Sequence, residues 1–444
     1  MHTKGMYRVA FALVLVAALV TMVACAGQSA PAPSSSKPAD TSSAPAPKAA
    51  APAPTAAAPS DATKPAPAAA AAKPASGDPY EINFITMLTG QMATSGQGQK
   101  KALDTYQSYA NARGGINGRP VKFTYHDDQA DAKISVQLVT DLVAKKVPVI
   151  MGPGMTGPTN AVVPLIAANG PVLYSMSPGV YPETGSYLFA AMPNNMQTFT
   201  GLLTFFKNKG WTKIAMLSST DATGSDIAAS VTKLLALPEF STLSLVVDEK
   251  TEPTATSMAA QATKIKASNA QVVILGILGA PASTAFKGLA QAGVELPTGT
   301  AVGNQNYATM NANKDVLPKE LYFPGSPSDV PEILPDGATK TVINDYRKLM
   351  LDGGNKPEVS HTVTWESASV IVEALKKTGT DVTPAKLRDT IQSIKGFEGL
   401  WGTYNFSPDN HRGVGPSNVY VERWDAAKDR WVAASGPGGA LLKP

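Results

Sequence analysis

The pattern of hydrophobic and polar positions changes abruptly near Tyr80. From there on, runs of about six apolar residues alternate with amphipathic stretches of about 10 to 15 residues, which is the rhythm of βαβ units with a parallel sheet. The pattern predicts strands at 82–88, 121–125, 147–151 and 172–175, and helices at 99–112, 132–145 and 158–168.

A second series of the same kind begins near Gln197. It predicts strands at 213–217, 243–247 and 271–275, and helices at 197–209, 225–235, 257–268 and 282–292. Further helices are expected at 338–351, 363–377 and 383–394, followed by a hairpin-like region over 402–432. Two such series predict an α/β fold of two Rossmann-like lobes with a central ligand cleft, because doubly wound sheets bind ligands at the carboxyl ends of their strands.

The first 78 residues lack this alternation and do not predict a folded domain. Lys4 and Arg8 lead into an apolar stretch, 9–23, that is too short to span a bilayer comfortably, so residues 1–25 are interpreted as a signal peptide. Residues 26–78 are rich in Ala, Pro and Ser and contain no aromatic or large aliphatic residue, which predicts a disordered tether. A mucin-like or wall-spanning spacer has the same composition.

Cys25 is the single cysteine of the chain. It follows Met22, Val23 and Ala24, a sequence that resembles a bacterial lipobox, in which the cysteine is lipidated and becomes the mature N-terminus. The alternative is an ordinary secreted protein with an unpaired thiol. In either case a single cysteine excludes a disulfide within the chain and a zinc site built from cysteines.

Composition argues against two further classes of function, metal binding and nucleic-acid binding. Four histidines scattered along the chain leave little material for a metal centre, so no metal is expected. The net charge of +4 is spread over 444 residues with no basic stripe interleaved with aromatics, so no nucleic-acid partner is expected.

Residues Gly152 to Gly157 spell G-x-G-x-x-G between a predicted strand and a predicted helix. A dinucleotide site would also need an acidic residue at the end of the following strand, but that strand ends at Ser175 to Ser177 and the next acid is Glu183. The motif therefore indicates a glycine-rich turn whose helix N-terminus suits a carboxylate. No cofactor is expected.

An acidic cluster of Asp127, Asp128 and Asp131 lacks the alternating ligands and closing Glu of a calcium loop. Helix capping and loop structure explain it more simply. The chain also contains no G-x-S-x-G, P-loop or H-E-x-x-H motif, and no nucleophile, base and orienting group occur together. The sequence therefore favours a binding protein over an enzyme.

Several short motifs occur in an order that resembles the type I extracytoplasmic solute-binding proteins of branched-chain amino acid (Leu/Ile/Val) ABC transporters. They are Leu88-Thr89-Gly90, Gly96, residues 110–119 (Ala-Asn-Ala-Arg-Gly-Gly-Ile-Asn-Gly-Arg), residues 127–131, Gly152-Pro153 and Ser177-Pro178-Gly179. The resemblance extends from Tyr80 to the C-terminus and is densest up to Pro182.

This resemblance implies the type I periplasmic binding protein fold, with two lobes that close on a small-molecule solute and deliver it to an ABC transporter permease. Lobe one is then expected at 79–195 plus 325–397, and lobe two at 196–324 plus 398–440. With the lipobox, it implies a periplasmic or extracytoplasmic location and attachment to the membrane through a lipid anchor. A ligand-sensing or protein-partner-binding lipoprotein of the same fold is the alternative.

The resemblance also implies a set of ligand-binding residues: Ser95, Gly154, Met155, Thr156, Ser177, Gly179, Val180, Thr223, Ile277 and Gln305. Thr156 matches the hydroxyl residue that holds the ligand carboxylate in amino-acid-binding members. Gln305 falls at the place of the acid that holds the ammonium, so the cationic half of the site is missing and an amino acid is disfavoured. The expected ligand is an aromatic or branched organic acid, or an amide, and Gln305→Glu is expected to add affinity for leucine.

Overall fold

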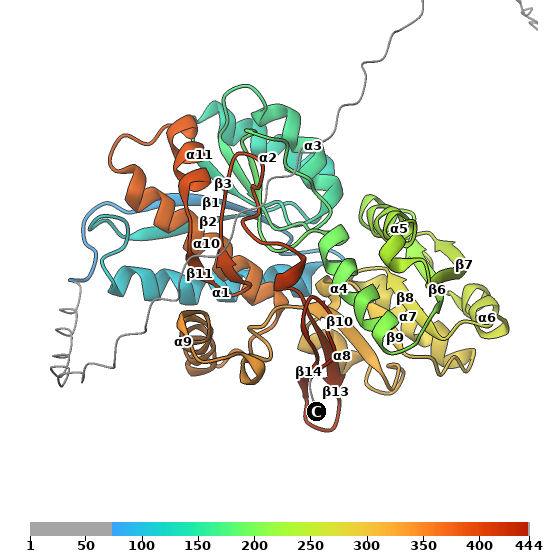
Figure 1. The fold of residues 1–444 in the computed structure, drawn as a ribbon. Helices are drawn as coiled ribbons and strands as arrows, with labels where there is room; N and C mark the ends of the chain where they lie inside the picture. Colours follow the sequence, from blue (N-terminus) through green and yellow to red (C-terminus); the bar gives the residue numbers. More distant parts are fainter. Residues whose placement is uncertain (1–72, 443–444) are drawn as a thin grey trace, which may run out of the picture. The chain divides into compact units, whose positions relative to one another are not determined.

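The computed structural model describes residues 73–442, which are drawn in colour in Figure 1. The signal peptide 1–25, Cys25 and nearly all of the tether 26–78 lie outside the described residues. Within residues 73–442, no helix is long and apolar enough to cross a membrane.

The first lobe contains a parallel five-stranded sheet in the order β2-β1-β3-β4-β5. Its strands are β1 (Tyr80–Thr86), β2 (Val121–Asp127), β3 (Val149–Met151), β4 (Val172–Ser175) and β5 (Leu188–Ala190). The helices that connect them are α1 (Ala93–Ala112), α2 (Ala132–Ala144) and α3 (Thr156–Ile166). The sequence predicted each of these elements except β5, which is three residues long.

The second lobe contains a seven-stranded sheet in the order β14-β13-β10-β9-β8-β6-β7. Its strands are β6 (Lys213–Ser219), β7 (Ser244–Thr251), β8 (Val272–Gly276), β9 (Thr298–Thr300), β10 (Leu321–Gly325), β13 (Tyr420–Asp425) and β14 (Arg430–Pro437). Its helices are α4 (Asn195–Asn208), α5 (Ala222–Leu235), α6 (Ala259–Ala267), α7 (Ala280–Gln291) and α8 (Tyr307–Ala312). The short elements α8, β9 and β10 were not predicted.

The chain crosses between the lobes three times. It leaves the first sheet after β5, and returns after β10 to form α9 (Ala338–Asp352), α10 (Val359–Thr378) and α11 (Pro384–Ser393). It then forms the hairpin β11 (Phe397–Gly399) and β12 (Gly402–Tyr404), and ends in the antiparallel strands β13 and β14.

The third crossover lies further along the chain than the expected division after residue 397. Trp401, Tyr404, Phe406 and Val414 all belong to the hydrophobic core of the first lobe. The crossover therefore falls between Val414 and β13. The hairpin pattern in the sequence carries no information about which lobe buries its aromatic side chains, and only their packing decides it.

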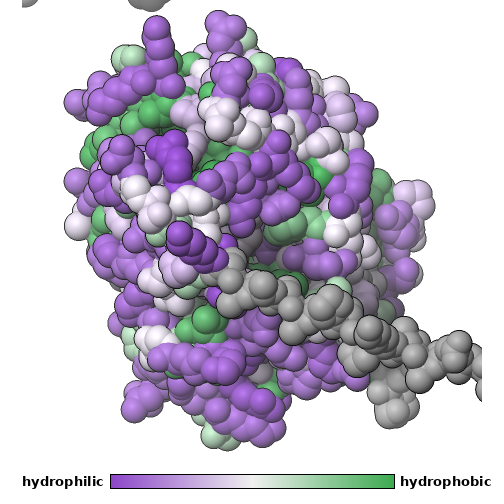
Figure 2. Space-filling view, turned by 90° about the vertical axis from the view of Figure 1, so that its left-hand side faces the viewer, coloured by the Kyte–Doolittle hydropathy of each residue, from purple (hydrophilic) through white to green (hydrophobic). Residues whose placement is uncertain are grey.

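Hydrophobic side chains of the strands form the cores of both lobes. The first lobe has one continuous core, whereas the sheet of the second lobe has a core on each face. One face of the folded part is mostly hydrophilic, with hydrophobic residues exposed only in small separate areas (Figure 2). The apolar runs in the sequence are therefore used for burial, which is the main favourable contribution to folding.

Helix α10 lies in the interior of the first lobe, packed against α1 and α11 (Figure 1). It buries polar as well as apolar side chains, among them Glu366, which is 1% exposed. One carboxylate oxygen of Glu366 accepts a hydrogen bond from the backbone N–H of Leu400, and the other has no partner among the described residues. Burial raises the pKa of Glu366 to about 8, although the Leu400 hydrogen bond opposes the shift.

We expect Glu366→Gln to flatten the dependence of stability on pH. The folded protein binds a proton at Glu366 that the unfolded chain releases near its ordinary pKa, so the contribution of Glu366 to stability is fully present at low pH and is lost as pH rises through about 8. The loss scales at about 1.4 kcal/mol per unit of pKa shift. Urea unfolding at pH 5 and pH 9 measures it, with the exposed Glu239→Gln as control. Equal slopes in the variant and the wild type would contradict the prediction.

Candidate functional site

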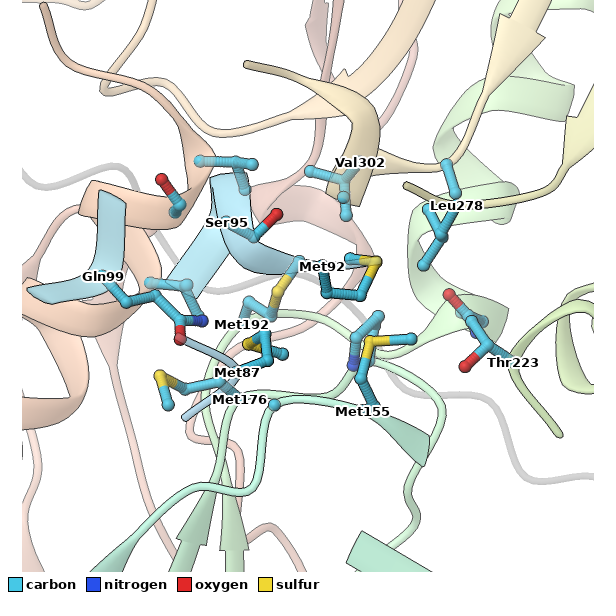
Figure 3. A pocket seen from close by; sticks show the side chains of 18 of the residues that line it. Met87, Met92, Ser95, Gln99, Met155, Met176, Met192, Thr223, Leu278 and Val302 are labelled. Carbon is cyan, nitrogen blue, oxygen red and sulfur yellow. The ribbon is translucent and has the colours of Figure 1, made fainter. Parts of the chain in front are cut away.

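A cavity lies where the two lobes face each other (Figure 3). The first lobe and the α10 region contribute Met87, Met92, Ser95, Gln99, Gly154, Met155, Met176, Pro178, Met192, Val359, Ser360 and Val363. The second lobe, with α4, contributes Asn195, Thr223, Ile227, Leu278, Ala301, Val302 and Gly303. The cavity thus lies at the carboxyl ends of the strands, where the doubly wound pattern places a ligand.

Five helices begin at this cavity. Met92 and Met155 are the N-cap residues of α1 and α3, Asn195 and Val359 open α4 and α10, and Thr223 is in the first turn of α5. A helix N-terminus carries roughly half a positive charge and leaves backbone N–H groups without partners. Asn194, Asp221 and Glu358 precede or cap three of these helices, whereas α1 and α3 have no capping side chain, so the starts of α1 and α3 favour a group that is negative or that accepts hydrogen bonds.

The start of α3 is open to such a group. Its N-cap residue, Met155, has no side-chain hydrogen bond to the helix. The backbone N–H groups of Thr156 and Gly157 donate to no group of the described residues. Neither residue lines the cavity itself, but Gly157 lines a neighbouring opening that shares Met155 with it.

The cavity wall is apolar and rich in methionine. Met87, Met92, Met155, Met176 and Met192 all contribute to it, and all five come from the first lobe (Figure 3). Methionine is unbranched and polarisable, so a wall built from it adapts to irregular apolar shapes. Such a wall suits a ligand with an apolar body.

None of the side chains that line the cavity carries a charge. The nearby Glu358 is already engaged, because its carboxylate accepts hydrogen bonds from Ser360 Oγ at 2.8 Å and from the N–H of Tyr307 at 2.9 Å. Asp226 accepts a hydrogen bond from Asn195 Nδ2 at 2.7 Å. Burial raises the pKa of both carboxyl groups. The cavity therefore offers an ammonium group no free carboxylate.

The same two carboxylates connect the lobes. Asp226 on α5 contacts Tyr181, whose hydroxyl lies 3.3 Å from its carboxylate, and Glu358 binds the second-lobe residue Tyr307. The N–H of Val359 also donates to the carbonyl of Gln305 at 3.4 Å. These hydrogen bonds span the cleft, as expected of lobes that have closed.

The loop after β4 is held from behind by a buried arginine. Arg412 donates hydrogen bonds to the carbonyls of Met192 at 2.7 Å, Ala191 at 3.0 Å and Val180. Burial lowers its pKa to about 10, so it remains charged at neutral pH. Carbonyl dipoles therefore compensate the charge, and the guanidinium fixes the loop that carries Met176 and Pro178 to the cavity.

Four of the predicted ligand-binding residues line the cavity: Ser95, Gly154, Met155 and Thr223. Ile277 lines a neighbouring opening that shares Met92, Met155, Thr223 and Leu278 with the cavity.

The other five predicted residues line neither the cavity nor this neighbouring opening. Thr156 and Ser177 share a hydrogen bond of 3.0 Å with each other. Gly179 packs against this pair, because a Cβ on it would collide with Thr156 Oγ1, and Val180 is buried. Gln305 lies in a separate buried cluster. The local motifs located these loops, but the direction of each side chain depends on packing between elements.

Gln305 faces the crossover between the lobes instead of the cavity. Its Nε2 donates to Glu422 Oε2 at 2.5 Å and to Asp329 Oδ2 at 3.3 Å. Burial raises the pKa of both carboxyl groups, and the neighbouring Asp329 raises the pKa of Glu422 further. An amide suits this place because it donates two hydrogen bonds and carries no charge. The expected role of Gln305 in ligand binding is therefore corrected to a structural one, and Val302 and Gly303 occupy the cavity wall nearby.

Sequence reasoning did not single out Gln99 or four of the five methionines. Gln99 lies on the face of α1 that also carries the buried residues Gly96, Leu103 and Tyr106. A glutamine on an otherwise apolar helix face is a signal that the sequence contained. The methionines carried no such signal, since their pattern is that of ordinary core residues.

A sequence profile of the periplasmic binding protein family matches residues 79–429. The Leu/Ile/Val-binding protein homolog 2 of Brucella abortus is 30% identical over 92 residues, or 21% of this chain and 24% of the relative. The chain spans about a quarter of the length of the curated relatives it matches.

Solved structures share the fold over most of their length. An extracellular ligand-binding receptor from Rhodopseudomonas palustris HaA2 has a TM-score of 0.70 at 20% identity, covering 80% of this chain and all of the other. The branched-chain amino acid transporter substrate-binding protein LivJ of Streptococcus pneumoniae, in complex with isoleucine, has a TM-score of 0.66 at 19% identity. The match covers 83% of this chain and 100% of LivJ. A fatty acid ABC transporter substrate-binding protein from Thermomonospora curvata has a TM-score of 0.66 at 17% identity. The match covers 83% of this chain and 92% of the other.

We expect Gln305→Glu to destabilise the protein without adding affinity for leucine. The change replaces a bridging amide by a third buried carboxyl group, and an unpaired buried polar group costs about 1–3 kcal/mol. Urea unfolding measures the loss and calorimetry tests leucine binding. Gln291→Glu, at an exposed position of the same lobe, is the control. A gain of leucine affinity would show that Gln305 reaches the ligand after all.

Proposed function

Because the chain belongs to the periplasmic binding protein family and is a binding protein, not an enzyme, we propose that it is the solute receptor of an ABC importer of the branched-chain amino acid type. Its lobes close on a small organic solute, which a permease then accepts. The observation that carries the proposal is the cavity between the lobes. Residues of both lobes line it, and five helices begin at its wall.

The proposed ligand is an organic acid or amide with an apolar body, aromatic or branched, and without an ammonium group. The helix N-termini supply the attraction for a carboxylate or carbonyl oxygen, and the methionine wall accommodates the apolar part. An ammonium group would enter a cavity with no charged side chain in its wall and would lose its hydration without a carboxylate partner there. The fatty-acid-binding relative shows that the same fold is found among proteins named for an acid without an ammonium group.

We also propose that the receptor is held at the outer face of a membrane by a lipid on Cys25. The support is the lipobox-like sequence and the position of the single cysteine directly after the apolar stretch. The Ala/Pro/Ser-rich segment would then act as a tether that leaves the lobes free to meet the permease.

We expect acids and amides, but not leucine, to stabilise the purified protein in a thermal-shift screen. The probes are 4-methylpentanoate, phenylacetate and 4-methylpentanamide, compared with leucine and with isoamylamine as a cationic control. A ligand at about a hundred times its dissociation constant adds about 2.7 kcal/mol of stability. Stabilisation by leucine alone would contradict the proposed ligand class but would agree with the proposed transport function. Stabilisation by none of the probes would favour a protein partner.

We expect Cys25→Ser to move the protein from the membrane fraction to the soluble fraction of the producing cell. Serine cannot form the thioether to the lipid, while the rest of the signal stretch is unchanged. Cell fractionation with immunoblotting measures the distribution, and Ser29→Ala, a short way beyond the cysteine, is the control. Equal membrane retention of both variants would contradict the lipid anchor.

A further inference from the structure

We infer that Gln99 is the polar anchor of the ligand, and that it selects a carboxylate or amide oxygen. The inference rests on the proposed function and deepens it, because it names the residue that sets the ligand's chemistry. Gln99 is only 5% exposed, yet its side chain reaches the cavity wall from the second turn of α1.

The amide of Gln99 is held in one orientation by Thr86. Thr86 is fully buried, and its Oγ1 donates to Gln99 Oε1 at 2.6 Å. The acceptor half of the amide is thereby occupied. The donor half, Nε2, makes no hydrogen bond with any described residue and lies 3.6 Å from where a Cβ of Gly154 would be. Figure 3 shows the amide extending toward the methionine side chains that line the cavity.

The unpaired N–H donor faces the cavity. A ligand that fills the cavity without supplying an acceptor buries this donor unpaired, so a ligand that supplies an acceptor to Nε2 gains affinity relative to one that does not.

The other polar side chains of the cavity do not select for a hydrogen-bond acceptor on the ligand. Ser360 Oγ donates to Glu358, and Asn195 Nδ2 donates to Asp226. The hydroxyls of Ser95 and Thr223 have no partner among the described residues, but a hydroxyl both donates and accepts. Gln99 presents a donor only, so it is the side chain that demands an acceptor.

The location of this donor fixes where the acceptor lies. Nε2 lies next to Gly154, which is followed in the cavity wall by Met155, the N-cap residue of α3. A carboxylate or amide oxygen there meets Gln99 and the positive end of α3 together. The apolar body of the ligand then extends along the methionine wall toward the second lobe.

The test compares three ligands that share one apolar skeleton: 4-methylpentanoate, 4-methylpentanamide and leucine. Titration calorimetry is carried out on the wild type, Gln99→Met, Gln99→Glu and Gln137→Met. Gln99→Met keeps the length of the side chain and removes the donor. Gln99→Glu keeps its shape and its bond to Thr86 but puts an acceptor in place of the donor. Gln137→Met makes the same substitution at an exposed position of α2.

We expect Gln99→Met to weaken binding of the acid and the amide at least tenfold, with Gln137→Met within twofold of the wild type. Gln99→Glu should weaken the acid more than the amide, by a further tenfold, because two carboxylates repel. A loss caused only by misfolding would affect both ligands equally, so this ratio identifies the anchor, and thermal melts of the free variants report on folding.

Two results would overturn the inference in different ways. If the wild type binds the acid or the amide and Gln99→Met binds as tightly as Gln137→Met, Gln99 is not the anchor and the proposed function stands. If the wild type binds leucine alone or none of the three probes, the proposed ligand class fails together with the anchor.

Discussion

The site depends on one electrostatic constraint: five helix N-termini meet in a cavity that has no charged side chain in its wall. The doubly wound topology contributes to this arrangement, because α1, α3, α4 and α5 each follow a parallel strand and begin beyond its carboxyl end, whereas α10 follows α9. The attraction for an acceptor group therefore comes from the backbone. The side chains are left to set shape, through the methionines, and selectivity, through a few uncharged polar groups.

The charged groups that the cavity lacks are buried behind it. Arg412 is surrounded by carbonyl groups of the loop after β4 and of the first crossover, while Asp329 and Glu422 share the amide of Gln305 near the second and third crossovers. Both arrangements join segments that are distant in sequence. Buried polar groups are costly unless their partners are in place, so they favour one relative placement of these segments. The connections between the lobes are thus specified by polar contacts, and the lobes themselves by apolar packing.

Closure of the cleft uses a different set of contacts, on the ligand side. Tyr181 and Tyr307 reach Asp226 and Glu358 across the cleft. Each of these contacts is a single hydrogen bond, and such bonds contribute about 1 kcal/mol each. A ligand that contacts both lobes lowers the free energy of the closed form further, relative to the open form. Binding therefore shifts the protein toward its closed form.

The sequence by itself determined the alternation of strands and helices, the two lobes and the family, because apolar runs and amphipathic periods are local properties of the chain. It also located the loops of the site, and Ser95, Gly154, Met155 and Thr223 do line the cavity. Only the tertiary structure decided that Gln305 turns to Glu422, that Thr156 and Ser177 bind each other, and that residues 400–414 pack in the first lobe. The direction of a side chain and the lobe that buries a hairpin are set by contacts between residues far apart in the sequence, and no local pattern records them.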